Sequence, residues 1–401
     1  MSGTEHRQPS GYHRVQHELE AMIANGVLPA GGLVPAERVL AQQLSASLGE
    51  VRLAVNKLAG QGRLVRVARK GTFVAANAVA AVRKPGEKPT VAVLVPDLAY
   101  FYPPVIQAME KEARKLGMNV FLGCVDGSLE LERQLIAQKI AEGASGIILA
   151  PVQPYGPAQP EFKHPFSLPR PPGSLDYLAA LPVPVVVFDH FGMDMPNIGV
   201  DCVLKDDFAG AYQATAHLIR HGRKKIAAFT GLTPGQVAPS YEGGQRWKGI
   251  AAALADHGLA VSDLPPLSTW NLDHDTDLIR RHLQAGADAF VLTDDNSAAI
   301  LIRMLTGWGV KVPDEVAVIG YDDEPLCLVI DPPLSSVRVP KQEMGRKAVQ
   351  FLHDRIANGT RGNYRSLILK PEVVARASCG CKPAHARRAA AGAADSVAKT
   401  V

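Results

Sequence analysis

Residues 35–74, PAERVLAQQLSASLGEVRLAVNKLAGQGRLVRVARKGTFV, decide the fold of the N-terminal part of the chain. Apolar residues recur at helical spacing over 36–44, and a second apolar stripe follows a short turn. Ser47 stands where the second helix should begin, with Glu50 three residues on, which predicts a capping box. Two short apolar stretches flank a basic turn at 69–71 and predict a two-stranded wing. We therefore expect a winged helix-turn-helix, a shape that lays one helix in the major groove of DNA.

The same stretch resembles the winged-helix domain of the GntR family of bacterial transcription repressors. The matching residues are Pro35, Glu37, Arg38, Leu40, Ala41, Leu44, Ser47, Val51, Arg52, Ala54, Leu58, Gly62 and Gly71-Thr72-Phe73-Val74. The resemblance implies DNA contacts by Arg38, Ser47 and Arg52. Residues 48–50 and Arg69 depart from the family pattern, which leaves the operator sequence open. The full set expected to contact DNA is Arg38, Ser47, Glu50, Arg52, Arg69, Lys70, Gly71 and Thr72.

Positive charge is concentrated in this part of the chain. Residues 1–75 hold nine Lys and Arg against five Glu, whereas the rest of the chain holds 34 of each sign. The whole net charge of +4 therefore lies in the segment expected to bind nucleic acid. A merely solvated basic surface would explain the charge but not the motif match.

Length and composition limit the class of protein. A chain of 401 residues predicts more than one domain, and 47% hydrophobic residues supply ample material for packed cores. The sequence has no run of about 18 apolar residues, so we expect no membrane span. Residues 1–10 lack the apolar core of a signal peptide, and five scattered cysteines suit a reducing compartment. We therefore expect a cytoplasmic protein.

The pattern of apolar residues changes at residue 90. Short apolar runs then alternate with helical patterns, which predicts parallel sheets covered on both faces and arranged in two lobes. The expected domains are a winged helix-turn-helix at 1–75 with a first helix at 12–25, a linker at 76–89, a sensor domain at 90–381 and a disordered tail at 382–401. The expected strands include 91–95, 119–124, 146–150, 183–188, 225–230, 289–293 and 315–320, and the expected helices include 207–221, 243–257, 274–285 and 296–308.

Residues 90–381 resemble the effector-binding domain of the LacI/GalR family, which is related to periplasmic sugar-binding proteins. The landmarks include VAVLVPD at 91–97, GASGIILAP at 143–151, PVVVFD at 184–189, QRWKG at 245–249 and VPDEVAVIGYDD at 312–323. A GntR-type domain joined to such a sensor resembles regulators of the arabinose repressor type. This resemblance implies a homodimer that binds a palindromic operator and responds to a small sugar.

The resemblance also implies a set of effector-binding residues near the ends of predicted strands. They are Asp97, Tyr100, Phe101, Asp189, Arg246 and Asp295. Carboxylates and arginine bind sugar hydroxyls, and an aromatic ring covers the C–H face of the sugar. Each aspartate could instead cap a helix near a strand end. Asp201 and Asp206 match one family aspartate equally well, and the sequence does not decide between them.

Three features fall outside these patterns. The insertion at 152–180 holds seven prolines and could be a lid over the cleft or a surface excursion. His217 and His221 have metal-like spacing, but a surface helix explains them as well. Cys379-Gly380-Cys381 could bind metal or form a redox pair, but the sequence shows no partner Cys or His cluster. We therefore predict no metal and no cofactor.

The sequence as a whole predicts a ligand-responsive transcription regulator that represses sugar-utilisation genes. A transcription activator of the same architecture and a sugar-binding protein without regulatory role remain alternatives. The chain has no Walker A, G-x-G-x-x-G, G-x-S-x-G or H-E-x-x-H motif, so we expect no catalytic residues and no enzyme activity.

Overall fold

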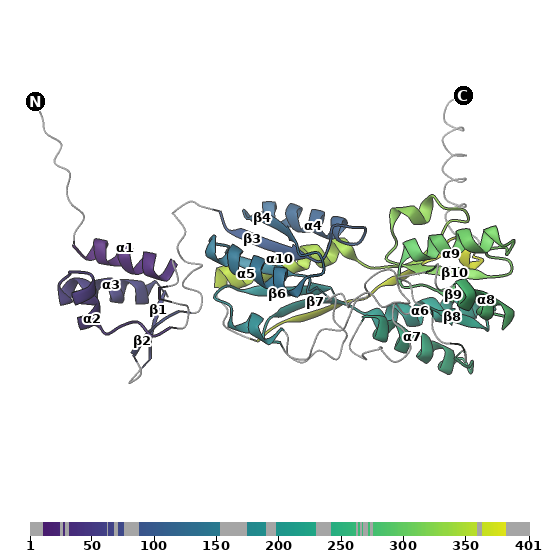
Figure 1. Cartoon of the computed structure of the whole chain (residues 1–401), viewed down its shortest axis with the longest axis horizontal. Coiled ribbons are helices and arrows are strands. Elements are labelled where there is room, and N and C mark those ends of the chain that lie inside the picture. Colours follow the sequence, from purple (N-terminus) through teal and green to yellow (C-terminus); the bar gives the residue numbers. More distant parts are fainter. Residues whose placement is uncertain are drawn as a thin grey trace, which may run out of the picture.

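The fold comprises a winged-helix unit followed by a two-lobed α/β unit, each with its own hydrophobic core (Figure 1). The structure is a computed structural model that describes residues 11–24, 27–28, 32–61, 63–67, 71–75, 88–152, 175–189, 198–229, 242–261, 264, 267, 272, 276–358 and 363–381. The predicted fold class is confirmed. Among the described residues, no helix combines the length and the apolar character needed to cross a bilayer.

The winged-helix unit packs three helices against a two-stranded wing. Its elements are α1 (Gly11–Ala24), α2 (Glu37–Gln43), α3 (Leu48–Gly60), β1 (Leu64–Val67) and β2 (Gly71–Val74). The stripe predicted for α3 is buried as expected and consists of Val51, Ala54, Val55 and Leu58. β1 and β2 pair antiparallel with Leu64 opposite Val74. The backbone N–H of Val34 donates to the carbonyl of Thr72 at 2.8 Å, which attaches the wing to the chain before α2.

The first lobe is built on a six-stranded, fully parallel sheet in the order β12-β7-β6-β5-β3-β4. The strands are β3 (Thr90–Val95), β4 (Asn119–Cys124), β5 (Gly146–Leu149), β6 (Val185–Asp189), β7 (Asp201–Lys205) and β12 (Ser366–Leu369). Residues of α4 (Tyr102–Lys115) and α10 (Lys341–Asn358) pack on one face of this sheet. Residues of α5 (Leu129–Ala141) and the short η2 (Asp176–Ala180) pack on the other.

The second lobe is built on a five-stranded sheet in the order β13-β11-β10-β9-β8. The strands are β8 (Ile226–Ala228), β9 (Ala289–Val291), β10 (Ala317–Tyr321), β11 (Ser335–Arg338) and β13 (Glu372–Val374), of which β13 alone runs antiparallel to its described neighbour. The helices α6 (Asp207–Arg220) and α7 (Glu242–Asp256) pack against each other and cover one face. On the other face lie α8 (Thr276–Gln284) and α9 (Asp295–Gly307), while η4 (Pro325–Leu328) and η5 (Ala377–Cys379) are short turns.

The chain passes between the lobes three times. It leaves the first lobe after β7 to enter α6, returns after β11 to enter α10, and leaves again between β12 and β13. These crossings place the carboxyl ends of β6 and β7 near those of β9 and β10. Ligands of open α/β sheets bind at such strand ends.

Several predicted segments lie outside the described residues. They are residues 76–87 of the linker, residues 153–174 of the insertion and the tail at 382–401. The linker, the lid and the disordered tail therefore stay predictions. Inside the described part, the predicted strands and helices are all present, and the sequence missed β7, β11, β12, β13 and α10.

Candidate effector cleft and nucleic-acid interface

The first lobe contributes a buried carboxylate with two partners. Asp189, the last residue of β6, is fully buried and has a left-handed backbone with φ +69°. The hydroxyl of Tyr102 donates to its Oδ2 at 2.9 Å, and Lys205 Nζ lies 2.7 Å from its Oδ1. Lys205 ends β7, and its ammonium group lies 4.7 Å from the centre of the Phe101 ring. Buried charges require such pairing, so the four side chains form one polar wall with an aromatic edge.

The second lobe contributes a buried arginine against an aromatic face. Arg246, in the first turns of α7, donates from Nε to Asp207 Oδ1 at 2.9 Å and from Nη1 to the carbonyl of Thr293. Its guanidinium lies 3.7 Å from the centre of the Tyr321 ring, within the range of a cation–π contact. Burial raises the pKa of Tyr321 well above its ordinary value, so the phenol keeps its proton. Among the described residues, the buried Tyr321 hydroxyl has no hydrogen-bond partner.

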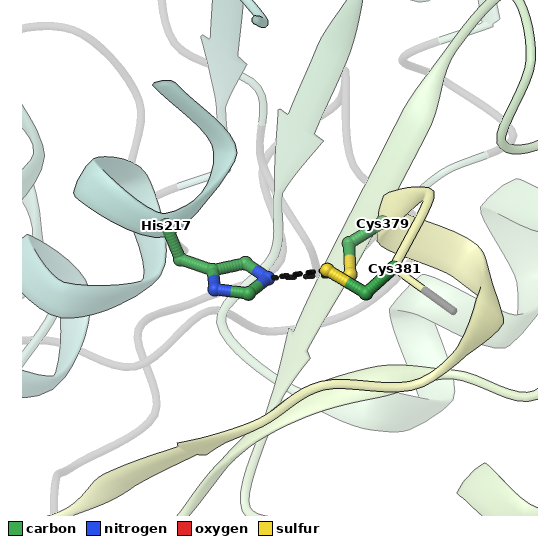
Figure 2. A group of neighbouring side chains, drawn as sticks. All are labelled: His217, Cys379 and Cys381. Carbon is green, nitrogen blue, oxygen red and sulfur yellow. Dashed lines mark hydrogen bonds between the residues drawn. The ribbon is translucent and has the colours of Figure 1, made fainter. Parts of the chain in front are cut away.

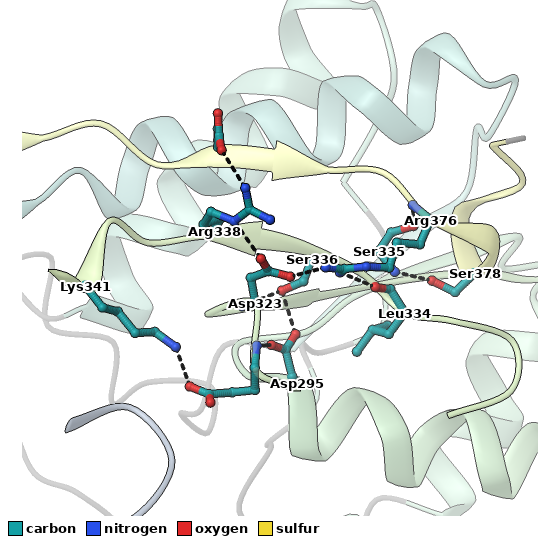
Figure 3. A network of polar contacts seen from close by, with 11 residues as sticks. Asp295, Asp323, Leu334, Ser335, Ser336, Arg338, Lys341, Arg376 and Ser378 are labelled. Atoms are coloured by element: carbon teal, nitrogen blue, oxygen red, sulfur yellow. Dashed lines mark hydrogen bonds and ion pairs between the residues drawn. The ribbon is translucent and has the colours of Figure 1, made fainter. Parts of the chain in front are cut away.

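Asp295, in the first turn of α9, holds the segment after β10 in place (Figure 3). Its Oδ1 accepts from Ser336 Oγ at 2.6 Å, and its Oδ2 accepts from the backbone N–H of Glu324 at 2.7 Å. A Cβ at Gly320 would come within 2.2 Å of Oδ1, so only glycine leaves room for this carboxyl group. Burial raises the pKa of Asp295 to about 8, although the two hydrogen bonds oppose the shift. These contacts give Asp295 a structural role, and the effector contact expected of it stays a prediction.

Glu324, in the segment after β10, forms a further buried ion pair. Lys341, the first residue of α10, binds the carboxylate of Glu324, and both side chains are buried (Figure 3). The Lys341 ammonium group also lies 5.3 Å from the centre of the Phe101 ring. Phe101 therefore stands between two lysines, and Lys341 links the helix covering the first lobe to the second lobe.

Two of the six predicted effector residues, Phe101 and Asp189, meet around Lys205, whereas Arg246 contacts Asp207 and Tyr321 in the second lobe. Asp97 is half-buried and accepts from the backbone N–H of Ala99 at 2.9 Å, and Tyr100 is 63% exposed, so the effector contacts expected of these two residues stay predictions. The residues that sequence reasoning missed are Tyr102, Lys205, Asp207, Tyr321, Glu324 and Lys341. Five of these six stand at the first or last position of a helix or strand, which is the signal that could have found them.

Neither aspartate left open by the sequence lies among the cleft residues described above. Asp206 caps α6 and accepts from the backbone N–H of Ala209 at 2.9 Å. Asp201 begins β7 and binds Arg355 and Arg365 at 2.7 and 2.8 Å, so it fastens α10 and the start of β12 to the sheet. The neighbouring Asp207 is the one that pairs with Arg246.

Several residues of the helix-turn-helix that are expected to contact DNA already bind neighbouring side chains or backbone groups. Ser47 and Glu50 form the predicted capping box, with the Glu50 backbone donating to Ser47 Oγ and the Ser47 backbone donating to Glu50 Oε2. Arg52 Nε lies 3.1 Å from Glu37 Oε2, and Arg66 Nη2 lies 3.3 Å from Glu37 Oε1. The direct base contact expected of Glu50 competes with its role in the cap.

The remaining candidates present an open basic surface. Arg38 on α2 is exposed, and Arg52 has a side chain that is 62% exposed despite its ion pair. Lys57 on α3, which is not among the predicted contacts, is exposed as well. Gly71 and Thr72 lie in β2, where Gly71 has φ +119°. Arg69 and Lys70 lie outside the described residues. This combination of exposed cations on a helix-turn-helix suits backbone and base-edge contacts with duplex DNA.

Comparisons with known proteins define the class. Residues 11–74 match the bacterial regulatory proteins of the gntR family, and residues 215–379 match the periplasmic binding protein-like domain. The chain is therefore a GntR-type DNA-binding domain fused to a periplasmic-binding-protein-like domain, the composition of a bacterial transcription regulator.

Two curated relatives align with the chain along nearly their whole length. The chain is 25% identical over 378 residues to the arabinose metabolism transcriptional repressor of Geobacillus stearothermophilus, a match that covers 92% of this chain and 97% of the relative. It is 24% identical over 391 residues to the repressor of the same name from Halalkalibacterium halodurans, with coverage of 92% and 96%.

Solved structures agree on the fold of the sensor. Transcription regulator CcpA of Lactococcus lactis superposes with a TM-score of 0.59 at 23% identity and covers 73% of this chain and 99% of its own. A complex of the transcriptional regulator CelR with cellobiose superposes with a TM-score of 0.59 at 22% identity and covers 86% and 100%.

Proposed function

We propose that the protein is a repressor of sugar-utilisation genes that leaves its operator when a small sugar binds between the lobes. The observation that carries the proposal is the buried pair of Arg246 and Tyr321 in a sensor joined to a GntR-type helix-turn-helix. A guanidinium can donate two hydrogen bonds to adjacent ligand oxygens, and the Tyr321 hydroxyl can gain a partner from a sugar hydroxyl. The named relatives are repressors of arabinose metabolism, and CelR binds cellobiose.

The charge of the cleft favours a neutral ligand. Lys205, Arg246 and Lys341 supply three positive charges, while Asp189, Asp207 and Glu324 supply three negative charges. Because these six charges pair, the described residues named here offer no excess of positive charge to a phosphate. Paired carboxylates with aromatic faces suit a neutral sugar, whose hydroxyls both donate and accept hydrogen bonds.

The regulator acts in the cytoplasm, where its DNA is, and works as a homodimer. Exposed apolar side chains on the second lobe suggest the surface on which a second copy of the chain packs. Leu328 is 67% exposed, Val329 82% and Ile300 39%. A groove on α9 and the loop after η4 adjoins them and is lined in part by Ile302, Arg303 and Ile330. A twofold dimer presents two winged helices to the two halves of a palindrome.

Val329→Glu should give a monomer in sedimentation runs where the wild type is a dimer.

A thermal-shift screen of pentoses, hexoses and their phosphates tests the ligand class. A ligand at 100 times its dissociation constant stabilises the protein by about 2.7 kcal/mol. We expect a neutral pentose or hexose to raise the melting temperature and to release the purified protein from operator DNA. If the phosphorylated sugars alone raise it, the charge argument is wrong; if no sugar acts on either readout, the sugar assignment fails.

The direction of regulation has its own test. A repressor lowers transcription from a promoter whose operator overlaps the polymerase site, and the sugar restores it. An activator of the same architecture would raise transcription from an upstream site instead. In vitro transcription with the purified protein, with and without sugar, separates the two.

A further inference from the structure

Two pairs of residues that the sequence left apart meet in the structure. His217 and His221 lie one turn apart at the end of α6, with ring centres 4.6 Å apart. Cys379 and Cys381 flank Gly380 after β13, and His217 points at both cysteines from α6 (Figure 2). The prediction that the cysteines lack a partner cluster is therefore wrong, because pairing across more than 150 residues is invisible in the sequence.

Short contacts connect the four possible donor atoms through Cys381 and His217. The Cys381 sulfur lies 3.1 Å from His217 Nε2 and 3.0 Å from His221 Nε2. The Cys379 sulfur lies 3.3 Å from His217 Nε2. His217, Cys379 and Cys381 have all their donor atoms within 4.8 Å of one another, and Cys379 is fully buried.

Rigid structure presents the two cysteines. Gly380 has φ +86°, a left-handed conformation that lets the chain turn between them. Ser378 Oγ donates to the carbonyl of Val318 at 2.7 Å and accepts from the backbone N–H of Ser335 at 2.8 Å. Arg376 donates to the carbonyl of Leu334 at 2.7 Å and to Asp323 at 2.5 Å (Figure 3). The Cys-Gly-Cys turn is thus fixed to the second-lobe sheet before it meets α6.

Hydrogen bonds alone explain this arrangement poorly. The thiol of Cys381 has one proton but lies within bonding distance of two imidazole nitrogens. One contact must then be an imidazole N–H donating to sulfur, which is a weak acceptor. A cation removes the conflict, since two thiolates and two neutral imidazoles can all donate electron pairs to it.

We propose that His217, His221, Cys379 and Cys381 bind one zinc ion in a closed, structural Cys₂His₂ site. Thiolate and imidazole are the ligands that zinc prefers, and the set contains no carboxylate of the kind that Mg²⁺ or Ca²⁺ requires. Tetrahedral zinc keeps a sulfur and a nitrogen ligand about 3.5 Å apart, given bond lengths of about 2.3 and 2.0 Å. The contacting donors therefore need to separate by a few tenths of an ångström, and His221, which already touches Cys381, has to complete the set by a side-chain movement, since only His217, Cys379 and Cys381 have all their donor atoms within 4.8 Å of one another. The ion would fasten the Cys-Gly-Cys turn to α6, the helix that begins with Asp207.

Cobalt substitution in the full-length protein tests the site. The protein is stripped with a chelator under reducing conditions, loaded with Co²⁺ and then titrated with Zn²⁺. We expect one ion per chain, visible d–d bands of tetrahedral cobalt, a thiolate-to-cobalt charge-transfer band, and loss of both signals as zinc displaces cobalt. Metal analysis of the zinc-loaded protein should give one zinc per chain. An octahedral spectrum without the thiolate band would overturn the proposal, as would the absence of bound metal.

Matched variants locate the ion. Cys381→Ser and His221→Ala change partly or largely exposed side chains, so each should fold and lose the cobalt spectrum. Cys124→Ser and His353→Ala alter a cysteine and a histidine elsewhere and should bind cobalt as the wild type does. Zinc should raise the melting temperature of the wild type and of the controls but not of the site variants. Equal zinc stabilisation in all five proteins would contradict the site, and so would a Cys379–Cys381 disulfide in protein kept reduced.

Discussion

The carboxyl group of Asp295 is fully buried, yet it accepts two hydrogen bonds that would suit a charged carboxylate. Burial dominates and raises its pKa to about 8 from an ordinary value of 3.8. The folded protein therefore keeps this proton at pH values where the unfolded chain has lost it. Such a group stabilises the fold most below pH 3.8, and this contribution is lost as the pH rises towards 8.

Asp295→Asn should remove this dependence on pH. The amide has the same shape, its oxygen can accept from the Glu324 backbone, and the Ser336 hydroxyl can rotate to accept from its nitrogen. The free energy of unfolding of the wild type should fall relative to the variant by up to about 1.4 kcal/mol per pH unit between pH 4 and 8. Urea denaturation across this range measures the difference. Parallel pH profiles would show that Asp295 ionises normally.

The family motifs pointed to individual residues of the candidate site, but not to the residues that form ion pairs with them. Asp189 and Arg246, which the resemblance named, are both buried, and the effector contact expected of them stays a prediction. Their ion-pair partners Lys205 and Asp207 depend on how strands and helices pack, which local sequence does not record. Tyr100 is 63% exposed, and a strand-end position in the sequence does not tell whether a side chain turns inward.

At the scale of the element, local chemistry explains where α3 begins. Ser47→Ala removes the N-cap acceptor and half of the capping box. Such a loss costs about 0.5–2 kcal/mol and should lower the melting temperature of the winged-helix transition by several degrees. Ser47→Thr is the matched control, because threonine can cap in the same way. Scanning calorimetry of the full chain resolves the effect, and equal transitions for the two variants would refute the role of the cap.

The surface formed by α2 and α3 gives a prediction about DNA. Arg38→Ala and Arg52→Ala should each weaken operator binding, since a base contact by arginine is worth about 1–3 kcal/mol. Arg114→Ala, on the exposed face of α4, is the control and should bind as the wild type does. Fluorescence anisotropy with operator and with scrambled DNA separates base contacts from phosphate contacts. Unchanged affinity in both arginine variants would remove this surface from the interface.

The elements that the sequence analysis missed escaped detection for two physical reasons. β12 and β13 are four and three residues long, and each pairs with a strand far away in the sequence. α10 buries Lys341 and Arg355 at the two ends of its inner face, so its apolar stripe is short for a helix of 18 residues. Long apolar strands such as β3 were found because parallel strands covered on both faces need continuous hydrophobic runs.

At the scale of the whole molecule, the polar groups of the candidate site come from both lobes. The three crossings act as the connection between the lobes, and Lys341 bridges α10 to Glu324 on the second lobe. Glu324 is held by Asp295, and the neighbouring Asp323 binds both Arg338 and Arg376 (Figure 3). A ligand that contacts both walls would favour the closed arrangement, and hinge closure around a ligand can alter the spacing of two attached DNA-binding domains.

Arg246→Ala tests this coupling, because the residue lies far along the chain from the winged helix and belongs to the cleft. The change removes the guanidinium that lies over the Tyr321 ring and donates to Asp207. The free energy of effector binding should therefore weaken by about 2–5 kcal/mol. Arg246→Lys keeps a charge but not the planar fork and should fall in between. Arg281→Ala, on the exposed side of α8, is the control.

Operator affinity without sugar should stay near the wild-type value in all three variants, which also shows that they fold. Release from the operator should then need far more sugar in Arg246→Ala than in the wild type or in Arg281→Ala. Anisotropy of labelled operator, titrated with the sugar found by the screen, measures both quantities in one experiment. If Arg246→Ala releases DNA at the wild-type sugar concentration, the effector does not bind at Arg246, and the assignment of Asp189 and Phe101 loses its main support.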